Sequence, residues 1–470
     1  MDIFEIKKIK KLRNFAPDFS WQLQYTQKYY YQLMKRRIIC CAVVAMMMAQ
    51  HATAQTPQRK ITIGELFTLV ESGSKTLRMQ KSGVDVSARG IEEAKSKRLP
   101  DVGASLQMSY NGNVVMTDRD FGNVKGFSQP HFGNSFALEA QQVVYAGGAI
   151  DAGVRLAELQ KEMSENTVSL TRNQQRFIAV GQYLDLYKIS NGIKVYDSNI
   201  SLTEKLIEDI SSKQSQGMAL KNDVTRYELQ MEQLKLGKRK LEDQRSILNH
   251  QLCNTLGLKD VVVEPVMDLE AFAAADLSEQ DLQTTASASS PLIRQSAIGM
   301  QIADQQLKLA KSELLPKVAI VAADNFTGPF NYDIPPIDNN FNIWYVGVGV
   351  KYSLSSLFKG NKSIRKAKEQ VRQSHDTHAV SHERVNNSMQ QAYTMHQQAF
   401  AELRTQQKSV ELANQNYKVV NNRYLNQLAL VTDMVDASNI KLNAELQEVN
   451  AQINIAYTYY NIMYVAGNIK

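Results

Sequence analysis

Four segments of the chain alternate apolar side chains with small or polar ones. Side chains point in turn to the two faces of a β-strand, so each segment predicts a strand with one apolar and one polar face. About ten residues are enough for a tilted strand to cross a bilayer. In a soluble sandwich the same alternation would separate core from solvent. The segments are residues 102–111, 132–141, 317–326 and 344–354, and in the third Val321 and Asp324 interrupt the pattern.

The chain between these segments predicts long helices, which argues against a compact sandwich. From about residue 149 to residue 214 there is no proline, and apolar residues recur at steps of three and four, as on one face of a helix. At ~1.5 Å per residue such a helix is on the order of 100 Å long. A second helix is predicted from about residue 222 to residue 256, with Gly257 as its C-terminal cap.

Landmarks of the first half recur in the second half at a nearly constant distance. Leu315-Pro316 lies 216 residues after Leu99-Pro100, and each pair ends a helix before a strand. Another proline-free helix is predicted from about residue 362 to residue 426. Asp433 follows Asp223 by 210 residues. Such a recurrence indicates a duplicated structural unit.

Each unit is predicted to be a β-hairpin on an antiparallel helical hairpin. We assign residues 55–257 to the first structural repeat, 258–288 to an equatorial connector and 289–470 to the second repeat. Four strands are too few for a membrane barrel, since about eight is the smallest known number, and lipid does not tolerate unpaired strand edges. The predicted fold class is therefore mostly α with a transmembrane β-barrel. Three copies give its simplest closed form, a trimeric barrel of about 12 strands above a periplasmic helical barrel.

Residues 34–54 have the features of a secretory signal peptide. Three basic residues after Met34 precede an apolar run that ends at Met48, and Ala52-Thr53-Ala54 matches a cleavage site. The apolar run is too short to span a bilayer. We interpret the basic and aromatic residues 1–33 as a mis-called N-terminal extension, with a genuine cytoplasmic leader as the alternative.

Charge and cysteine content narrow the class of protein. The net charge of +7 falls to +1 without residues 1–54, because that segment carries nine basic and three acidic side chains. A nucleic-acid partner is therefore not indicated. Cys40 and Cys41 lie in the predicted signal peptide. Cys253 would then be the one cysteine of the mature chain, so no internal disulfide can form, and its helical context predicts a core residue.

The order and duplication of these features resemble the TolC-like outer-membrane efflux protein family over about residues 57–470. The specific marks are the Leu-Pro pair before each hairpin and, above all, the two helical tips. The tips read Gly217-Met218-Ala219-Leu220-Lys221-Asn222-Asp223-Val224 and Leu428-Ala429-Leu430-Val431-Thr432-Asp433-Met434-Val435-Asp436-Ala437.

The resemblance implies a homotrimeric channel in outer-membrane lipid that extends into the periplasm. Such a channel is a passive conduit for small-molecule export, binds no cofactor, and works with a periplasmic adaptor protein and an inner-membrane pump. By position, Asp433 and Asp436 match the acidic rings that constrict the family's pore, and Tyr424, Asn222 and Asp223 match its gate-tethering positions.

The acidic tip residues have two interpretations. Three symmetry-related carboxylates around one axis would favour cations and resist anions. Alternatively, Asp223 and Asp433 cap the returning helices, where a carboxylate satisfies free N–H groups. Asp436, one turn further on, is then the better pore-facing acid. Ala429 occupies a position where some family members have a basic gate residue, so we expect a weaker or differently built tether here.

The turn residues of the tips also have two interpretations. They either pack within the turns, or form a docking patch for the helices of the adaptor. These residues are Gly217, Met218, Ala219, Leu220, Leu428, Ala429 and Leu430.

No enzymatic or metal-binding motif accompanies these features. His375, His378 and His382 lie at helical spacing but lack an acidic or cysteine cluster, which favours a solvated helix face over a metal site. Two other functions stay open. One is a type I protein-secretion channel of the same fold. The other is a periplasmic coiled-coil adaptor, which would explain the helices but not four strands with an apolar face.

Overall fold

The computed structural model describes residues 57–267, 272, 278–331 and 336–469. The predicted extension and signal peptide, residues 1–54, therefore lie outside the described residues. Residues 59–259 and 263–470 form one compact unit by themselves.

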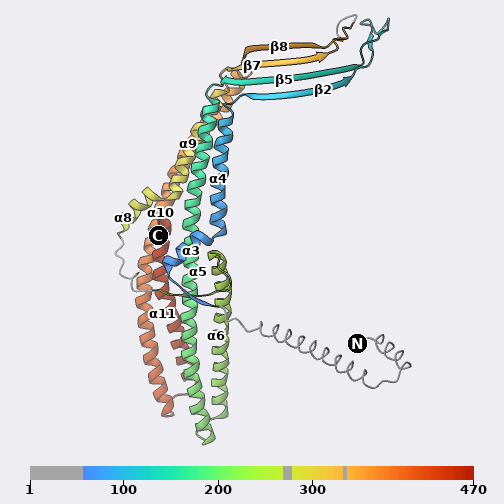
Figure 1. The fold of residues 1–470 in the computed structure, drawn as a ribbon. Helices are drawn as coiled ribbons and strands as arrows, with labels where there is room; N and C mark the ends of the chain where they lie inside the picture. Colours follow the sequence, from blue (N-terminus) through green and yellow to red (C-terminus); the bar gives the residue numbers. More distant parts are fainter. Residues whose placement is uncertain (1–56, 268–271, 273–277, 332–335, 470) are drawn as a thin grey trace, which may run out of the picture. The chain divides into compact units, whose positions relative to one another are not determined.

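The four predicted strands are confirmed, and they form one antiparallel sheet in the order β2-β5-β7-β8. The two hairpins thus lie side by side in a single sheet (Figure 1). The second strand is longer than predicted, because a bulge between Val143 and Tyr145 lets it continue past the end of the alternation. The strands are β2 (Asp101–Tyr110), β5 (Phe132–Tyr145), β7 (Lys317–Gly328) and β8 (Phe341–Lys351).

The register gathers most of the large apolar residues of the four strands on one face of the sheet. Leu106 lies opposite Phe136, which lies opposite Phe326 on its other side. Large apolar side chains on this face are exposed, as a membrane-facing surface requires. The most exposed of them are Val102, Leu106, Met108, Tyr110, Phe132, Trp344, Val346, Val348 and Val350.

The register also explains the two interruptions in the third strand. Asp324 lies between Leu138 and Trp344, so it is an acidic residue on the apolar face. Val321 lies between Gln141 and Gly347, so it is an apolar residue on the polar face. The strand keeps its period of two through both positions, and the residue types alone break the pattern.

Long helices extend from the sheet, as predicted (Figure 1). The two longest have 67 and 70 residues, which at ~1.5 Å per residue is on the order of 100 Å each. The helices are α3 (Ile63–Gly73), α4 (Lys75–Ser96), α5 (Ala149–Ser215), α6 (Lys221–Leu256), α8 (Glu279–Ser289), α9 (Pro291–Ser312), α10 (Ser356–Leu425) and α11 (Val431–Val465). None of the helices among the described residues combines the length and apolar character needed to cross a membrane.

The start of α10 differs from the prediction. The helix begins at Ser356, not near residue 362, and Gly360 lies inside it. Gly360 packs so closely on Leu314 that a Cβ atom there would lie 2.4 Å from the Cδ2 atom of Leu314. This glycine therefore serves close packing and not the end of a turn.

Two layers of helix contacts divide the unit along its length. Near the sheet, α5 packs on α4 and α9, and α9 packs on α10. Towards the tips, α5 packs on α6 and α11, and α11 packs on α10. The helices α4, α6 and α10 consequently lie at the edges and have fewer neighbours than α5 (Figure 1).

The connector contains regular structure that was not predicted. β6 (Val262–Pro265) pairs with β1 (Gln58–Ile61), and α8 packs on α10. The hydroxyl group of Tyr183 lies 2.8 Å from the carbonyl oxygen of Ile61 and accepts a hydrogen bond from the N–H group of Val266 at 2.9 Å. Cys253 is buried in the same hydrophobic core, as predicted.

A small hairpin lies within the loop that joins β2 to β5. It pairs β3 (Val114–Met116) with β4 (Lys125–Phe127). Each strand has only three residues, too few to produce an alternation that can be recognised in the sequence.

Candidate functional site at the helical tips

The two helical hairpins end in tips of the same backbone geometry. The N–H group of Met218 donates to the carbonyl oxygen of Lys213 at 2.8 Å, and the N–H group of Leu428 donates to that of Arg423 at the same distance. These bonds satisfy carbonyl groups that the ends of α5 and α10 leave unpaired. The tips are therefore repeats in structure as well as in sequence.

The residue in the left-handed conformation differs between the tips. Gly217 has φ +74°, and Gln427, 210 residues later, has φ +61°. Glycine adopts this conformation without steric cost, whereas a side chain with a Cβ atom is strained there. Backbone hydrogen bonds from Gln427 to Tyr424 and from Leu428 to Arg423 accompany this conformation, which the backbone preference of Gln427 opposes.

Asp223 and Asp433 cap the returning helices. The Oδ2 atom of Asp223 accepts a hydrogen bond from the N–H group of Leu220 at 3.1 Å. Asp433 accepts the matching bond from Leu430 at 3.0 Å. Both carboxylates also lie in the positive field of a helix N-terminus. The capping interpretation is thus confirmed for both residues, and their part in a pore constriction stays a prediction.

Asp436 and Asn222 do not cap a helix. Both side chains are exposed, and neither has a hydrogen bond or ion pair to another of the described residues. Among the described residues, no basic side chain lies within ion-pair distance of the Asp436 carboxyl group. Its role as the pore-facing acid of the second tip stays a prediction.

Tyr424 packs into the hydrophobic cluster between the two tips. The Nζ atom of Lys213, on the other hairpin, lies 5.5 Å from the centre of its ring, a distance typical of a cation–π contact. Burial and, to a smaller extent, the charge of Asp223 raise the pKa of the Tyr424 phenol above its ordinary value. Tyr424 thus links the two hairpins through packing and charge.

Tyr227 is a central residue of the tips that the sequence analysis missed. Its side chain is buried, and its hydroxyl group has no hydrogen-bond partner among the described residues. Burial raises the pKa of this phenol strongly, and the nearby Tyr424, Tyr417 and Asp223 raise it further. Its position four residues after Asp223, on the same face of α6, was the available signal.

Two hydrogen bonds, each from a buried amide side chain to a half-buried partner, were also missed. The Nε2 atom of Gln230 donates to the Oδ1 atom of Asn439 at 2.7 Å, which joins α6 to α11. The Nδ2 atom of Asn199 donates to the Oε2 atom of Glu445 at 3.0 Å, which joins α5 to α11. Both bonds couple the first repeat to the second, the arrangement that a tether between tips requires.

The predicted docking residues divide into exposed and packed groups. Met218, Leu220, Leu428 and Leu430 expose 53–70% of their surface. Ala219, by contrast, packs against the cluster of the tips, and Ala429 is partly buried. The end of each hairpin therefore presents two large apolar side chains to its surroundings, more than turn packing needs.

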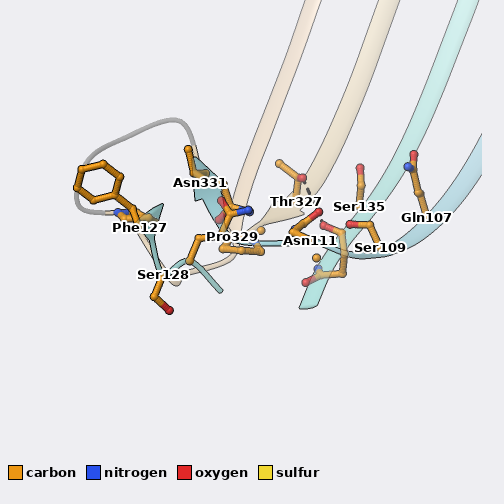
Figure 2. Close-up of a pocket in the computed structure, with 15 residues that line it drawn as sticks. Gln107, Ser109, Asn111, Phe127, Ser128, Ser135, Thr327, Pro329 and Asn331 are labelled. Atoms are coloured by element: carbon orange, nitrogen blue, oxygen red, sulfur yellow. Dashed lines mark hydrogen bonds between the residues drawn. The ribbon is translucent and has the colours of Figure 1, made fainter. Parts of the chain in front are cut away.

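A polar hollow of about 740 Å³ lies at the opposite end of the unit, where β2, β5 and β7 reach the loops (Figure 2). Ser109, Asn111, Ser135 and Thr327 are among its lining residues, and no described lining residue is charged. The described lining thus offers hydroxyl and amide groups but no charged side chain and no histidine.

His375, His378 and His382 of α10 do not assemble into a metal site. The Nδ1 atom of His378 lies 2.8 Å from the hydroxyl oxygen of Ser296, and its ring meets that of His382 edge to face. Among the described residues no group of three or more potential ligands lies close enough to hold a metal ion.

Comparison with known proteins finds similarity in sequence and in fold to outer-membrane efflux proteins. The sequence model of the outer membrane efflux protein family matches residues 282–468. A curated relative, the outer membrane efflux protein BepC of Brucella suis biovar 1 (strain 1330), is 20% identical over 406 residues, which cover 84% of this chain and 82% of the relative.

Solved structures of outer-membrane channels have the same fold. The outer membrane protein VceC of Vibrio cholerae superposes with a TM-score of 0.68 at 14% identity, over 86% of this chain and 96% of VceC. CusC superposes with a TM-score of 0.73 at 11% identity, over 87% and 92%. The open state of the MtrE channel of Neisseria gonorrhoeae gives 0.67 at 12%, over 86% and 89%. The second half of the chain thus matches the outer membrane efflux protein family, and most of the chain has the fold of these solved outer-membrane proteins.

Proposed function

We propose that this protein is the outer-membrane channel of a tripartite efflux system and conducts small molecules that an inner-membrane pump delivers. The observation that carries the proposal is one sheet with an exposed apolar face, continuous with helical hairpins on the order of 100 Å long. The sheet suits a membrane, and the helices are long enough to cover a distance that no compact domain covers. The channel is passive, and the pump supplies the energy.

The sheet needs other copies of the chain to become a barrel. Its edge strands β2 and β8 each pair on one side only among the described residues. Lipid cannot hydrogen-bond the free backbone groups of such edges. Three copies close the sheet into a barrel of about 12 strands, and their helices then form a second barrel in the periplasm.

The tips form the periplasmic end of this channel. Around a threefold axis, Asp436 of each copy contributes one carboxylate to a negative constriction that favours cations. Met218, Leu220, Leu428 and Leu430 form the surface on which the helices of a periplasmic adaptor dock. Asp223 and Asp433 hold the tips in shape through their caps, and Tyr424 and Gln230 connect them.

Single-channel conductance in planar bilayers tests this function. We expect cation-selective pores from the purified wild type and a lower selectivity for cations in Asp436→Asn. Asp304→Asn, which removes an exposed carboxylate from α9, is the matched control and should keep the selectivity of the wild type. Folded protein without pores would overturn the proposed function. Pores of equal selectivity in all three proteins would overturn the role of Asp436 alone.

A periplasmic adaptor explains the structure less well, because a soluble adaptor has no use for a sheet with one exposed apolar face. A protein-secretion channel would share the fold, and the cargo of the pump distinguishes it from an efflux channel. Export of small molecules by cells that carry the gene and by cells that lack it separates these two functions.

A further inference from the structure

The two edge strands of the sheet are matched in length and in direction. β2 has 10 residues and runs away from the helices, while β8 has 11 residues and runs towards them. In a closed ring of copies, β8 of one copy therefore meets β2 of the next in the antiparallel sense. We propose that this seam forms in one register, in which Asp101 of one copy lies opposite Lys351 of its neighbour. The inference rests on the proposed trimeric channel.

The faces of the two strands limit the registers that can form. Even-numbered residues of β2 lie on the apolar face, and so do even-numbered residues of β8 such as Val346 and Val348. A shift of one residue would turn the apolar side chains of one strand towards the polar face of the other. Only shifts by two residues keep the apolar face continuous across the seam.

Strand length selects one register from this set. With Asp101 opposite Lys351, all 10 residues of β2 find partners in β8, and Tyr110 lies opposite Asn342. A shift by two residues in either direction leaves at least one residue of β2 without a partner in β8. Each lost partner leaves backbone hydrogen-bonding groups unpaired at the edge of a sheet.

Charge favours the same register. Lys351 lies directly opposite Lys317 within the sheet, an unfavourable pairing of like charges. Neither lysine has an ion-pair partner among the described residues, nor does Asp101. All three side chains are exposed and lie on the polar face, at the ends of the strands next to the helices. Asp101 of the neighbour brings a negative charge to this pair of lysines.

The tilt of the strands agrees with this register. One row of paired residues runs from Asp101 through Gln141 and Val321 to Gly347. In the proposed register the row continues to Ser105 of the next copy, four residues further along β2. With a rise of ~3.3 Å and a strand spacing of ~4.8 Å, this advance gives a barrel tilt of about 35°, within the usual range of about 35–45°.

The two neighbouring registers fit less well. If Gly347 lay opposite Gly103, the tilt would be only about 19°, well below the usual range. If Gly347 lay opposite Gln107, the tilt would be about 46°, and Asp101 would extend past the end of β8 and lose Lys351. The proposed register alone combines full pairing, the ion pair and an ordinary tilt.

Pairs of introduced cysteines test the register. Gly103→Cys with Gly349→Cys places the two thiols opposite each other in the proposed seam. A Cβ atom meets nothing within 4 Å at Gly103 and only atoms at 4.0 Å at Gly349, so both sites accept the change. The control pairs, each shifted by two residues, are Gly103→Cys with Gly347→Cys and Ser105→Cys with Gly349→Cys. All variants carry Cys253→Ala and are prepared from the outer-membrane fraction.

After mild oxidation, we expect the first pair to give the highest yield of covalently linked trimers on a non-reducing gel. A higher yield from either control pair would overturn the proposed register. Native mass spectrometry of the same samples reports the number of copies independently. If trimers form and cross-link in a shifted register, the register is wrong and the proposed function still holds. If the protein is monomeric and no variant cross-links, both the register and the proposed trimeric channel are wrong.

A charge reversal tests the ion pair separately. Asp101→Lys places a third positive charge at the seam, and we expect the fraction of trimer that survives detergent on a gel to fall several-fold. The double variant Asp101→Lys with Lys351→Asp should recover most of that fraction. Loss of trimer in the single variant without recovery in the double variant would contradict the pairing of these two residues.

Discussion

The two tips of the helical hairpins share one backbone and differ in the residues that build it. Both have the same closing hydrogen bond and the same aspartate cap. The first tip has Gly217 in the left-handed position, and the second has Gln427. The first tip also places the large side chain of Tyr227 in the shared core, whereas the equivalent residue of the second tip, 210 residues later, is the small, buried Ala437. The common backbone therefore comes from packing and capping, and the conformational strain at the left-handed position differs between the two tips.

The largest expected effect comes from the core of the tips. Tyr227→Ala should destabilise both tips by about 3–5 kcal/mol, because it leaves a cavity where a buried ring was. Ala437→Gly, at the equivalent position, should cost only about 1 kcal/mol through helix propensity. Hydrogen exchange measured on peptides from each tip gives both values. Tyr227→Phe is the control: its hydroxyl group has no partner among the described residues, so its loss should change little. Equal losses at the two positions would contradict the asymmetric core.

The caps should contribute equally in the two tips. Asp223→Ala and Asp433→Ala each remove a carboxylate that accepts a backbone N–H, and each should cost about 1 kcal/mol. Chemical denaturation followed by a fluorophore at each tip measures the loss. Asp436→Ala, which breaks no such bond, should stay within about 0.5 kcal/mol. A larger loss from Asp436→Ala than from Asp433→Ala would show that the capping assignment is wrong.

The left-handed positions should respond in opposite directions to substitution. Gln427→Gly should stabilise the second tip by about 1 kcal/mol, because it removes the strain of a side chain at positive φ. Gly217→Ala should destabilise the first tip by a similar amount. The same hydrogen-exchange assay reports both changes. Destabilisation by Gln427→Gly would mean that contacts of the glutamine side chain outweigh its backbone strain.

Substitution of the exposed apolar residues of the tips should have the smallest effect on stability. The effect on function should be large. Met218→Ser and Leu428→Ser should each change the free energy of unfolding by less than about 0.5 kcal/mol, since both side chains are exposed. If these residues dock the adaptor, export by living cells should fall although the trimers remain intact. A variant that carries both Met218→Ser and Leu428→Ser and still exports normally would show that these two residues do not belong to the docking surface.

The sequence predicted the parts of the fold that follow a regular period. The strand pattern held through Asp324 and Val321 because position along the strand, and not residue type, decides the face. The long α5 was predicted closely, since no proline or paired glycine interrupts it. The start of α10 was placed too late, because Gly360 has the residue type of a turn but packs against Leu314.

The contacts that join the two repeats could not be predicted from the sequence. Gln230 and Asn439 lie 209 residues apart, and neither belongs to a local pattern that points to the other. Tyr227 has the spacing of an ordinary core residue, and its central position depends on both tips being in place. The caps of Asp223 and Asp433 could be recognised in the sequence as one of two interpretations, because a cap involves only residues three positions apart.

The exposed apolar face and the two unpaired edges of the sheet make a single, unassembled chain prone to aggregation. Strand edges of this length are templates for uncontrolled growth into aggregates, and apolar surface adds to the hazard. A lone chain that completed this sheet before meeting its neighbours would be a substrate for precipitation or proteolysis. If the chain forms the proposed trimer, folding of the strands must be coupled to assembly, so that yield depends on the local concentration of chains.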